Sequence, residues 1–274
     1  MQYDPIKKTL GKVFNKTPFL RISFYKLLDL LLLRAWHVRK EIRNWAGKTQ
    51  PGQGKTKRYI LDAGSGFGQY TYLLTGLSTS WFVDAVDVKD EQIADCNAFF
   101  TRIGRENVLF EKADLTQFTM PDRFDLILSV DVMEHIGDDG AVFRNFYDSL
   151  TQHGMLLIST PSDQGGSDVH DHEEGGSFID EHVRDGYNIL EIQEKLKHAG
   201  FSKTEARYTY GTPGKIAWRL SMKYPVLMLN TTKLFFILLP FYYLLTFPVA
   251  FCCNWLDLKM THKTGTGLIV KAWK

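Results

Sequence analysis

From residue 59 onward, short apolar runs alternate with stretches that have the length and periodicity of amphipathic helices. Such alternation predicts an α/β domain with a mainly parallel sheet, and uninterrupted apolar strands fit a sheet covered by helices on both faces. We expect strands at 59–63, 81–88, 108–111, 124–130 and 155–160, helices at about 68–78, 91–104, 139–151 and 187–200, and two later strands at 204–210 and 267–273.

Length and charge narrow the class of protein further. A chain of 274 residues can bury one substantial core with an appended subdomain. Residues 1–60 carry a net charge of +11, residues 61–211 of −16, and residues 212–274 of +7, which indicates that the two basic ends share an anionic partner. The three cysteines have neither metal-ligand spacing nor a disulfide framework, and no secretory signal is expected, so a reducing cytoplasmic setting fits.

The first expected strand leads into a glycine-rich turn. Residues 59–70 read YILDAGSGFGQY, with a glycine at every second position of the turn and a helix after it. Glycine permits the close backbone approach and positive φ that such a crossing needs, and the helix N-terminus offers free N–H groups to a ligand. A dinucleotide-binding G-x-G-x-x-G pattern would need glycine at position 69, where this chain has Gln69.

The pattern D-x-G-x-G-x-G that begins at Asp62 resembles motif I of class I S-adenosylmethionine-dependent methyltransferases. Matching segments follow in the order that this family has them. They are Asp87 at the end of the second strand, Ala113-Asp114-Leu115 after the third, FDLILSVDVMEHI at 124–136, and GMLLISTP at 154–161. The last two resemble the branch that contains ubiquinone and menaquinone methyltransferases (methyltransferase domain types 11 and 12), and the resemblance covers roughly residues 59–211 and 265–274.

The resemblance implies a Rossmann-like, seven-stranded methyltransferase fold, a parallel sheet with an antiparallel last strand. It implies S-adenosyl-L-methionine as cofactor and S-adenosyl-L-homocysteine as product. Asp62 would hold the methionine amino group, Asp87 both ribose hydroxyls, and Asp114 the adenine amino group. The candidate cofactor residues are Asp62, Gly64, Ser65, Gly66, Gly68, Tyr70, Asp87, Val88, Ala113, Asp114, Leu115, Val130, Asp131 and His135.

Most such enzymes align an acceptor for in-line attack on the methyl group and, where needed, remove its proton. Candidate bases therefore lie beyond the carboxyl ends of the fourth and fifth strands, where ligands bind in open α/β sheets. His135 is a candidate base because imidazole titrates near neutrality. Alternatively, Glu134 and His135 order the loop or contact the methionine part of the cofactor. His170, His182 and Tyr187 are further candidates to face the acceptor.

The connection over residues 162–187 is long and rich in His, Asp, Glu and Gly. Irregular connections of this length are usually functional or disordered, and the composition favours a lid over the acceptor pocket. A divalent metal site is the alternative, because imidazole and carboxylate groups are its usual ligands. Clustered acids and histidines more often form a solvated polar loop, so we predict no metal.

Residues 234–253 carry no charge over twenty positions, which is long enough to cross a membrane. A single crossing would leave the sixth and seventh strands on opposite sides of a bilayer, although both belong to one sheet. The segment must therefore return to its starting side, as a re-entrant hairpin or by lying in the interface. Pro240 and Pro248 are compatible with bending, and flanking lysines and arginines would meet anionic headgroups. Internal packing is the alternative.

Residues 19–45 form a second amphipathic stretch, with polar side chains near one helical face and leucines over much of the rest. A basic helix of this type can lie on a membrane, and a helix packed over the core or in a dimer contact is the alternative. The expected organisation is a basic helical extension and linker at 1–58, the cofactor-binding core at 59–211, a hydrophobic helical insertion at 212–264, and the last core strand at 265–274.

These features predict a bacterial-type methyltransferase that acts on a small lipophilic acceptor, with O-methylation preferred over N- or C-methylation. It would be peripheral or monotopic on the inner face of the cytoplasmic membrane, with no nucleic-acid partner. One alternative is a soluble small-molecule N- or O-methyltransferase whose insertion closes the pocket or forms a homodimer contact. A different class, a catalytically silent cofactor-binding scaffold, is the third hypothesis.

Overall fold

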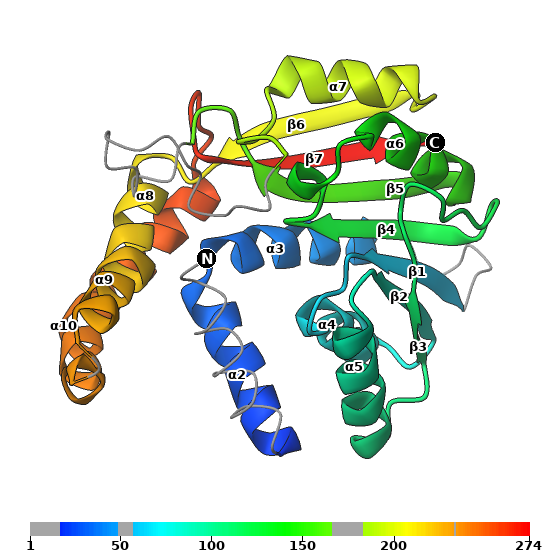
Figure 1. The fold of residues 1–274 in the computed structure, drawn as a ribbon. Helices are drawn as coiled ribbons and strands as arrows, with labels where there is room; N and C mark the ends of the chain where they lie inside the picture. Colours follow the sequence, from blue (N-terminus) through cyan, green and yellow to red (C-terminus); the bar gives the residue numbers. More distant parts are fainter. Residues whose placement is uncertain (1–16, 49–56, 166–182, 233) are drawn as a thin grey trace.

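The computed structural model describes residues 17–48, 57–165, 183–232 and 234–274. Its centre is a seven-stranded sheet in the order β3-β2-β1-β4-β5-β7-β6 (Figure 1). The first five strands are mutually parallel, and β7 is antiparallel to both of its neighbours, which confirms the predicted fold class. The strands are β1 (Arg58–Ala63), β2 (Trp81–Asp87), β3 (Val108–Lys112), β4 (Phe124–Val130), β5 (Leu150–Pro161), β6 (Lys203–Thr209) and β7 (Gly267–Trp273).

Helices cover both faces of the sheet, because successive strand residues point to opposite sides. Ile60 in β1 packs with α3 (Leu33–Lys48) and α4 (Gln69–Leu77) on one face, which α5 (Asp90–Arg102) also covers. Its neighbour Leu61 packs with α6 (Asp139–Ser149) and α7 (Ile189–His198) on the other. Burial of both residues is complete. Figure 1 shows the two helical layers above and below the sheet.

The N-terminal amphipathic stretch forms two helices. α2 (Pro18–Leu31) begins after Thr17, whose hydroxyl accepts a hydrogen bond from the Leu20 N–H, and ends at Leu32, where the backbone is extended. α3 then lies against the sheet with Val38 and Ile42 fully buried. The second helix is therefore a core element, as in the alternative of a helix packed over the core.

The hydrophobic insertion is a helical hairpin that projects from the sheet edge (Figure 1). Its outgoing arm is α8 (Thr212–Trp218), a π-helical turn η2 (Arg219–Lys223) and α9 (Tyr224–Thr231), and its returning arm is α10 (Phe235–Lys259). β6 and β7, which flank the insertion, pair with each other, so the hairpin leaves and rejoins the same edge of the body. α10 is continuous through Pro240 and Pro248, the two positions expected to allow bending.

Two tyrosines join the arms of this hairpin. The Tyr224 N–H bonds the Arg219 carbonyl five residues back, and Pro225 has no N–H, so the carbonyls of Leu220 and Ser221 lack the donors that a regular α-helix would give them. The Tyr242 hydroxyl donates to the Leu220 carbonyl at 2.8 Å, and the Tyr243 hydroxyl donates to the Ser221 carbonyl at 2.7 Å. Side chains of α10 thus satisfy the backbone of η2 and fix the pairing of the arms.

A buried polar cluster fixes the base of the hairpin to the core. The carboxylate of Asp257, near the end of α10, is fully buried and accepts hydrogen bonds from the N–H groups of Gly211 and Gly214 at 2.8 and 3.1 Å. His37 of α3 donates from Nε2 to the same carboxylate at 2.9 Å, and its Nδ1 accepts from Arg207 at 3.2 Å. Burial lowers the pKa of His37, so this imidazole is neutral at pH 7.

Candidate cofactor and acceptor site

The glycine-rich turn after β1 has the left-handed backbone that its sequence predicts. Gly64, Gly66 and Gly68 have φ values of 80°, 53° and 81°. A Cβ at position 64 would lie 2.9 Å from one Val132 methyl carbon and closer still to the other, whereas a Cβ at position 66 would meet nothing nearer than 3.9 Å. The turn is thus closed on one side at Gly64 and open at Gly66, where a ligand can approach the backbone.

Asp62 lies on the inner side of this turn. Its side chain is 3% exposed, and its carboxylate accepts a hydrogen bond from the Thr71 hydroxyl at 2.5 Å. Burial raises the pKa of Asp62 to about 6, against the opposing effect of the Thr71 hydrogen bond. A buried carboxylate of this kind gains from the approach of a cation. Thr71, one turn into α4, is a site residue that the sequence did not single out.

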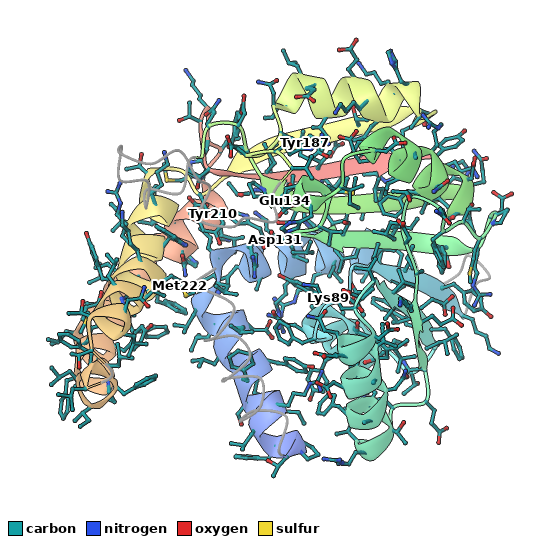
Figure 2. The ribbon with its side chains drawn as sticks, viewed as in Figure 1. Lys89, Asp131, Glu134, Tyr187, Tyr210 and Met222 are labelled. Carbon is teal, nitrogen blue, oxygen red and sulfur yellow. The ribbon has the colours of Figure 1, made fainter. Side chains whose placement is uncertain are left out.

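Asp87 lies beside the turn because β1 and β2 are adjacent and in register. Its carboxylate accepts the N–H of Gly66 at 2.9 Å and the N–H of Lys89 at 2.9 Å. These bonds hold both carboxylate oxygens at the rim of the turn. Lys89 marks this rim in Figure 2. Val88, between them, is 56% exposed. Carboxylate oxygens fixed in this way can accept a pair of ligand hydroxyls.

The segment after β3 joins the same rim. The Ala113 N–H donates to the Asp87 carbonyl at 3.0 Å, and Leu115 is buried in the core. Asp114 is held by the N–H and the hydroxyl of Thr116, at 2.9 and 2.7 Å, and these hydrogen bonds lower its pKa. The carboxyl ends of three neighbouring strands therefore bring Asp62, Asp87 and Asp114 to one edge of the sheet.

Two serine hydroxyls at this edge have no hydrogen-bond partner among the described residues. They are Ser65 Oγ in the turn and Ser129 Oγ in β4, both buried. Ser129 pairs with Ala63, so it lies next to the start of the turn. Buried hydroxyls are nearly always hydrogen-bonded in native proteins. A turn open at Gly66, three fixed carboxylates and two buried hydroxyls therefore fit a polar ligand with a cationic group and several hydroxyls.

The end of β4 carries the next group of candidates. Asp131, which follows Val130, has a φ of 51° and forms an ion pair with Arg34 at the start of α3. The backbone N–H of Arg34 donates to the Tyr210 hydroxyl at 3.0 Å. Tyr70, at the start of α4, also interacts with the charge of Arg34. Burial raises the pKa of Tyr70 to about 12, and the Arg34 charge opposes this rise. Sequence reasoning missed Arg34, because a single arginine within an amphipathic helix gives no signal of where it points.

Beyond Asp131, the 3₁₀ turn η1 (Met133–His135) positions Glu134 and His135. The Glu134 side chain is 1% exposed, accepts the Thr160 hydroxyl at 3.1 Å, and has a pKa raised by burial. Its carbonyl accepts N–H groups of Val183 and Arg184, so Glu134 orders the described C-terminal end of the 162–187 connection. His135 is half-buried beside it. Figure 2 shows Asp131, Glu134 and Tyr210 at one end of the sheet.

Tyr187, predicted to face the acceptor, lies in the packed interior. Its side chain is fully buried, and its hydroxyl donates to Asp139 Oδ2 at 2.8 Å and approaches the Met133 carbonyl at 3.2 Å. Burial and the Asp139 carboxylate raise its pKa. Its phenol therefore fixes η1 on α6. His170 and His182 lie outside the described residues.

α2 packs against the outer side of the glycine-rich turn, a contact that the sequence did not predict. The Tyr25 hydroxyl donates to the Phe67 carbonyl at 2.5 Å, and Arg21 donates to the same carbonyl at 2.7 Å. The Gln69 amide donates to Asp29 at 2.9 Å. Tyr25 is 1% exposed, so this contact is part of the packed interior. Within the described residues, no group of His, Cys, Asp and Glu is arranged to hold a metal ion.

The sheet order, the glycine turn after β1 and the carboxylates at the ends of β1, β2 and β3 define a class I S-adenosylmethionine-dependent methyltransferase. A family model described as a methyltransferase domain matches residues 55–205. The chain belongs to this family, and S-adenosylmethionine is its cofactor.

Two named relatives each match part of the chain. A phosphoethanolamine N-methyltransferase of Triticum aestivum is 33% identical over 154 residues, and the match covers 56% of this chain and 28% of that protein. A malonyl-[acyl-carrier protein] O-methyltransferase of Bacillus anthracis is 29% identical over 111 residues, 40% of each chain. The matches thus span less than half of either relative.

Among solved structures, phosphoethanolamine N-methyltransferase 2 of Haemonchus contortus in complex with S-adenosyl-L-methionine aligns with a TM-score of 0.58. The identity is 20%, and the alignment covers 85% of this chain and 52% of that one. This likeness supports the fold.

Proposed function

We propose that this enzyme transfers a methyl group from S-adenosylmethionine to a small lipophilic acceptor at the inner face of the cytoplasmic membrane, with a hydroxyl oxygen as the preferred atom. The bound cofactor supplies an electrophilic methyl group on a sulfonium. The protein has to hold the cofactor, align the acceptor and remove its proton. We assign the cofactor amino group to Asp62, the ribose hydroxyls to Asp87 and the adenine amino group to Asp114.

His135 is our candidate for the base that removes the acceptor proton. It lies on η1, four residues after Asp131 of the Arg34–Asp131 ion pair and next to the buried Glu134. Imidazole has the right basicity for this task near neutral pH. Substituting His135 by Ala should lower kcat at unchanged cofactor affinity; a normal kcat would assign His135 to loop ordering instead.

The observation that carries the membrane proposal is the position of the hairpin relative to this site. α10 is long and apolar enough to cross a membrane. Its most apolar window of 18 residues has a mean hydropathy of 2.0, and 6% of that window is buried. Its base is tied to the site: Asp257 accepts from the Tyr210 N–H at 3.3 Å, and the Tyr210 hydroxyl accepts from Arg34, the partner of Asp131. An apolar surface that begins beside the acceptor edge suits an acceptor dissolved in lipid.

Exchange of exposed apolar residues on the hairpin tests this proposal. The variant Phe241→Ser/Leu244→Ser/Leu245→Ser changes side chains that are 66%, 74% and 76% exposed. We expect it to keep the thermal stability and cofactor affinity of the wild type and to lose vesicle binding and turnover of lipid-borne acceptor.

The matched control is Leu77→Ser/Leu109→Ser/Leu190→Ser, which removes three exposed leucines away from the hairpin, at 43%, 48% and 76% exposure. This control should bind vesicles as the wild type does. If the wild-type protein does not bind vesicles, the membrane proposal fails.

A second candidate is a soluble small-molecule methyltransferase whose hairpin forms a lid or a dimer contact. The names of the relatives favour it, since their acceptors are phosphoethanolamine and malonyl-[acyl-carrier protein]. Incubation of a cell extract with deuteromethyl-labelled cofactor separates the two: label in the aqueous fraction favours this candidate, and label in the organic fraction favours the lipophilic acceptor. Cofactor binding with label in neither fraction would favour the scaffold hypothesis.

A further inference from the structure

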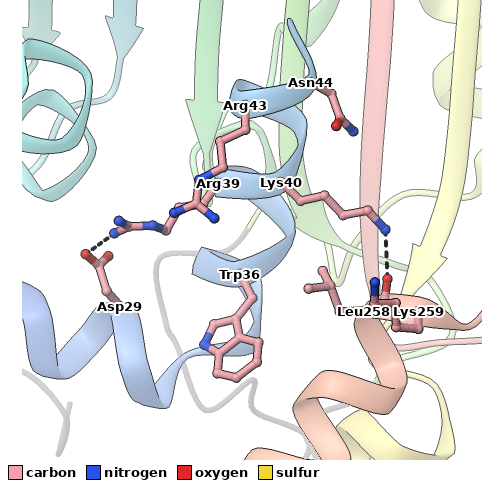
Figure 3. A pocket seen from close by; sticks show the side chains of 8 residues that line it. All are labelled: Asp29, Trp36, Arg39, Lys40, Arg43, Asn44, Leu258 and Lys259. Atoms are coloured by element: carbon pink, nitrogen blue, oxygen red, sulfur yellow. Dashed lines mark hydrogen bonds and ion pairs between the residues drawn. The ribbon is translucent and has the colours of Figure 1, made fainter. Parts of the chain in front are cut away.

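A cleft of about 350 Å³ lies on the outer face of α3, between the end of α2 and the end of α10 (Figure 3). One of its lining residues, Asp29, accepts the Gln69 amide, so the cleft lies on the outer side of the contact between α2 and the glycine turn. Its lining is predominantly basic, with one carboxylate among four cations. The lining residues are Asp29, Trp36, Arg39, Lys40, Arg43, Asn44, Leu258 and Lys259.

The cations of the cleft are only partly neutralised. Arg39 forms an ion pair with Asp29, and Lys40 donates to the Leu258 carbonyl at 2.8 Å, contacts that Figure 3 draws as dashed lines. Arg43 and Lys259 are exposed and have no ion-pair or hydrogen-bond partner among the described residues. Burial, and then the charge of Arg207, lower the pKa of Lys40, as expected where cations are crowded. The cleft therefore has a net positive charge that an anion would relieve.

The wall of the cleft continues into the apolar surface of the hairpin. The indole of Trp36 packs edge-on against Phe251 of α10, with ring centroids 5.0 Å apart, and its N–H donates to the Leu30 carbonyl at 3.2 Å. Phe251 is 41% exposed, and Leu27 and Leu30 on α2 are 45% and 41% exposed. If α10 enters a bilayer, the cleft lies where the apolar helix meets the body of the protein, at the depth of lipid headgroups.

We propose that this cleft binds the phosphate group of an anionic phospholipid. Guanidinium and ammonium groups are the usual protein ligands of phosphate, and Arg43 of α3 and Lys259 of α10 both line the cleft without an ion-pair partner among the described residues. An indole beside the cations suits the interface between headgroup and acyl chain. The inference rests on the membrane association proposed above, and it goes further by giving the enzyme a preference among lipids that is independent of its acceptor.

Vesicle binding at physiological ionic strength tests the site without use of turnover. Wild-type protein should bind vesicles that contain phosphatidylglycerol more tightly than vesicles of phosphatidylcholine alone. The variant Arg43→Ala/Lys259→Ala should lose roughly tenfold or more of its affinity for the anionic vesicles and keep its affinity for phosphatidylcholine, given about 1 kcal/mol per cation near such a surface. The matched control, Arg144→Ala/Lys197→Ala, removes one arginine and one lysine that are exposed on α6 and α7, on the other face of the sheet.

The outcomes are distinct. Equal losses in the two double variants would overturn the cleft site in favour of a general charge effect, and an unchanged anionic preference in Arg43→Ala/Lys259→Ala would overturn it outright. Wild-type binding of inorganic phosphate that the cleft variant loses, with no vesicle binding, would overturn the lipid assignment in favour of a soluble phosphate. Anionic-vesicle preference without methyl transfer would support the cleft and count only against the proposed reaction.

Discussion

At the scale of single residues, the buried carboxylate of Asp62 makes cofactor binding sensitive to pH. Its raised pKa of about 6 means that the folded protein without ligand favours the neutral acid more than the unfolded chain does. This group's contribution to stability therefore falls as pH rises from about 4 to about 6. The cofactor amino group, in contrast, should pair with the ionised form, so affinity should rise with pH over the same range.

We therefore predict that S-adenosylmethionine binds about tenfold more weakly at pH 5 than at pH 7.5, since protonation must be reversed on binding. Titration calorimetry at the two pH values measures this difference. The variant Asp62→Asn should bind weakly at both pH values with little difference between them. Wild-type affinity that is constant from pH 5 to 7.5 would remove Asp62 from the amino-group contact.

The two glycines at the start of the turn should respond differently to a methyl group. Gly64→Ala would press on Val132 in a left-handed backbone, so we expect a loss of about 2–4 kcal/mol in the free energy of unfolding. Gly66→Ala places its methyl in open space and should cost only about 1 kcal/mol for the backbone, yet weaken cofactor binding tenfold or more. Urea unfolding and calorimetry on both variants measure this contrast. Normal cofactor affinity in Gly66→Ala would place the ligand elsewhere.

At the scale of elements, the buried carboxylate of Asp257 joins α10, α3 and the start of α8. Asp257→Ala leaves the N–H groups of Gly211 and Gly214 and the imidazole of His37 without their acceptor in the interior. We predict a loss of about 3 kcal/mol or more in the free energy of unfolding, measured by urea denaturation. The control Glu191→Ala breaks an exposed pair with Lys195 one turn away and should cost about 0.5 kcal/mol at most. Similar small losses in both variants would contradict the anchoring role of Asp257.

The sequence predicted regular elements best where one pattern was strong and local. The expected helices at about 91–104 and 139–151 correspond closely to α5 and α6, because apolar periodicity there coincides with burial against the sheet. The break between α2 and α3 was not predictable, because no glycine or proline marks Leu32. It is set by contacts at a distance in sequence: Tyr25 on the Phe67 carbonyl and the Arg34 N–H on Tyr210.

The candidate site divides in the same way. Asp62, Asp87 and Asp114 were singled out through the resemblance to the family's motifs, and the parallel strands bring them to one edge of the sheet. Arg34 and Thr71 were not, since helix orientation decides whether such side chains point inward. The contact of Tyr187 could not be predicted, because Asp139, which accepts the hydrogen bond of its hydroxyl, lies 48 residues away in the sequence.

At the scale of the whole molecule, basic charge and exposed apolar surface occur together at one end. α10 and α2 carry exposed apolar side chains, and the basic cleft lies between their bases. The acidic core carries the cofactor site at the carboxyl edge of its sheet. This separation agrees with the charge distribution along the sequence, in which basic terminal regions flank an acidic middle. It fits the proposed division between a surface that contacts lipid and a core that performs the methyl transfer.

The most direct test of this account is mass spectrometry of a total lipid extract incubated with the enzyme and deuteromethyl-labelled S-adenosylmethionine. We expect a labelled product in the organic fraction, formed by the wild type, reduced in Gly66→Ala, and absent when Phe241, Leu244 and Leu245 are replaced by serine. Labelled product confined to the aqueous fraction, with equal yield from the hairpin variant, would contradict it.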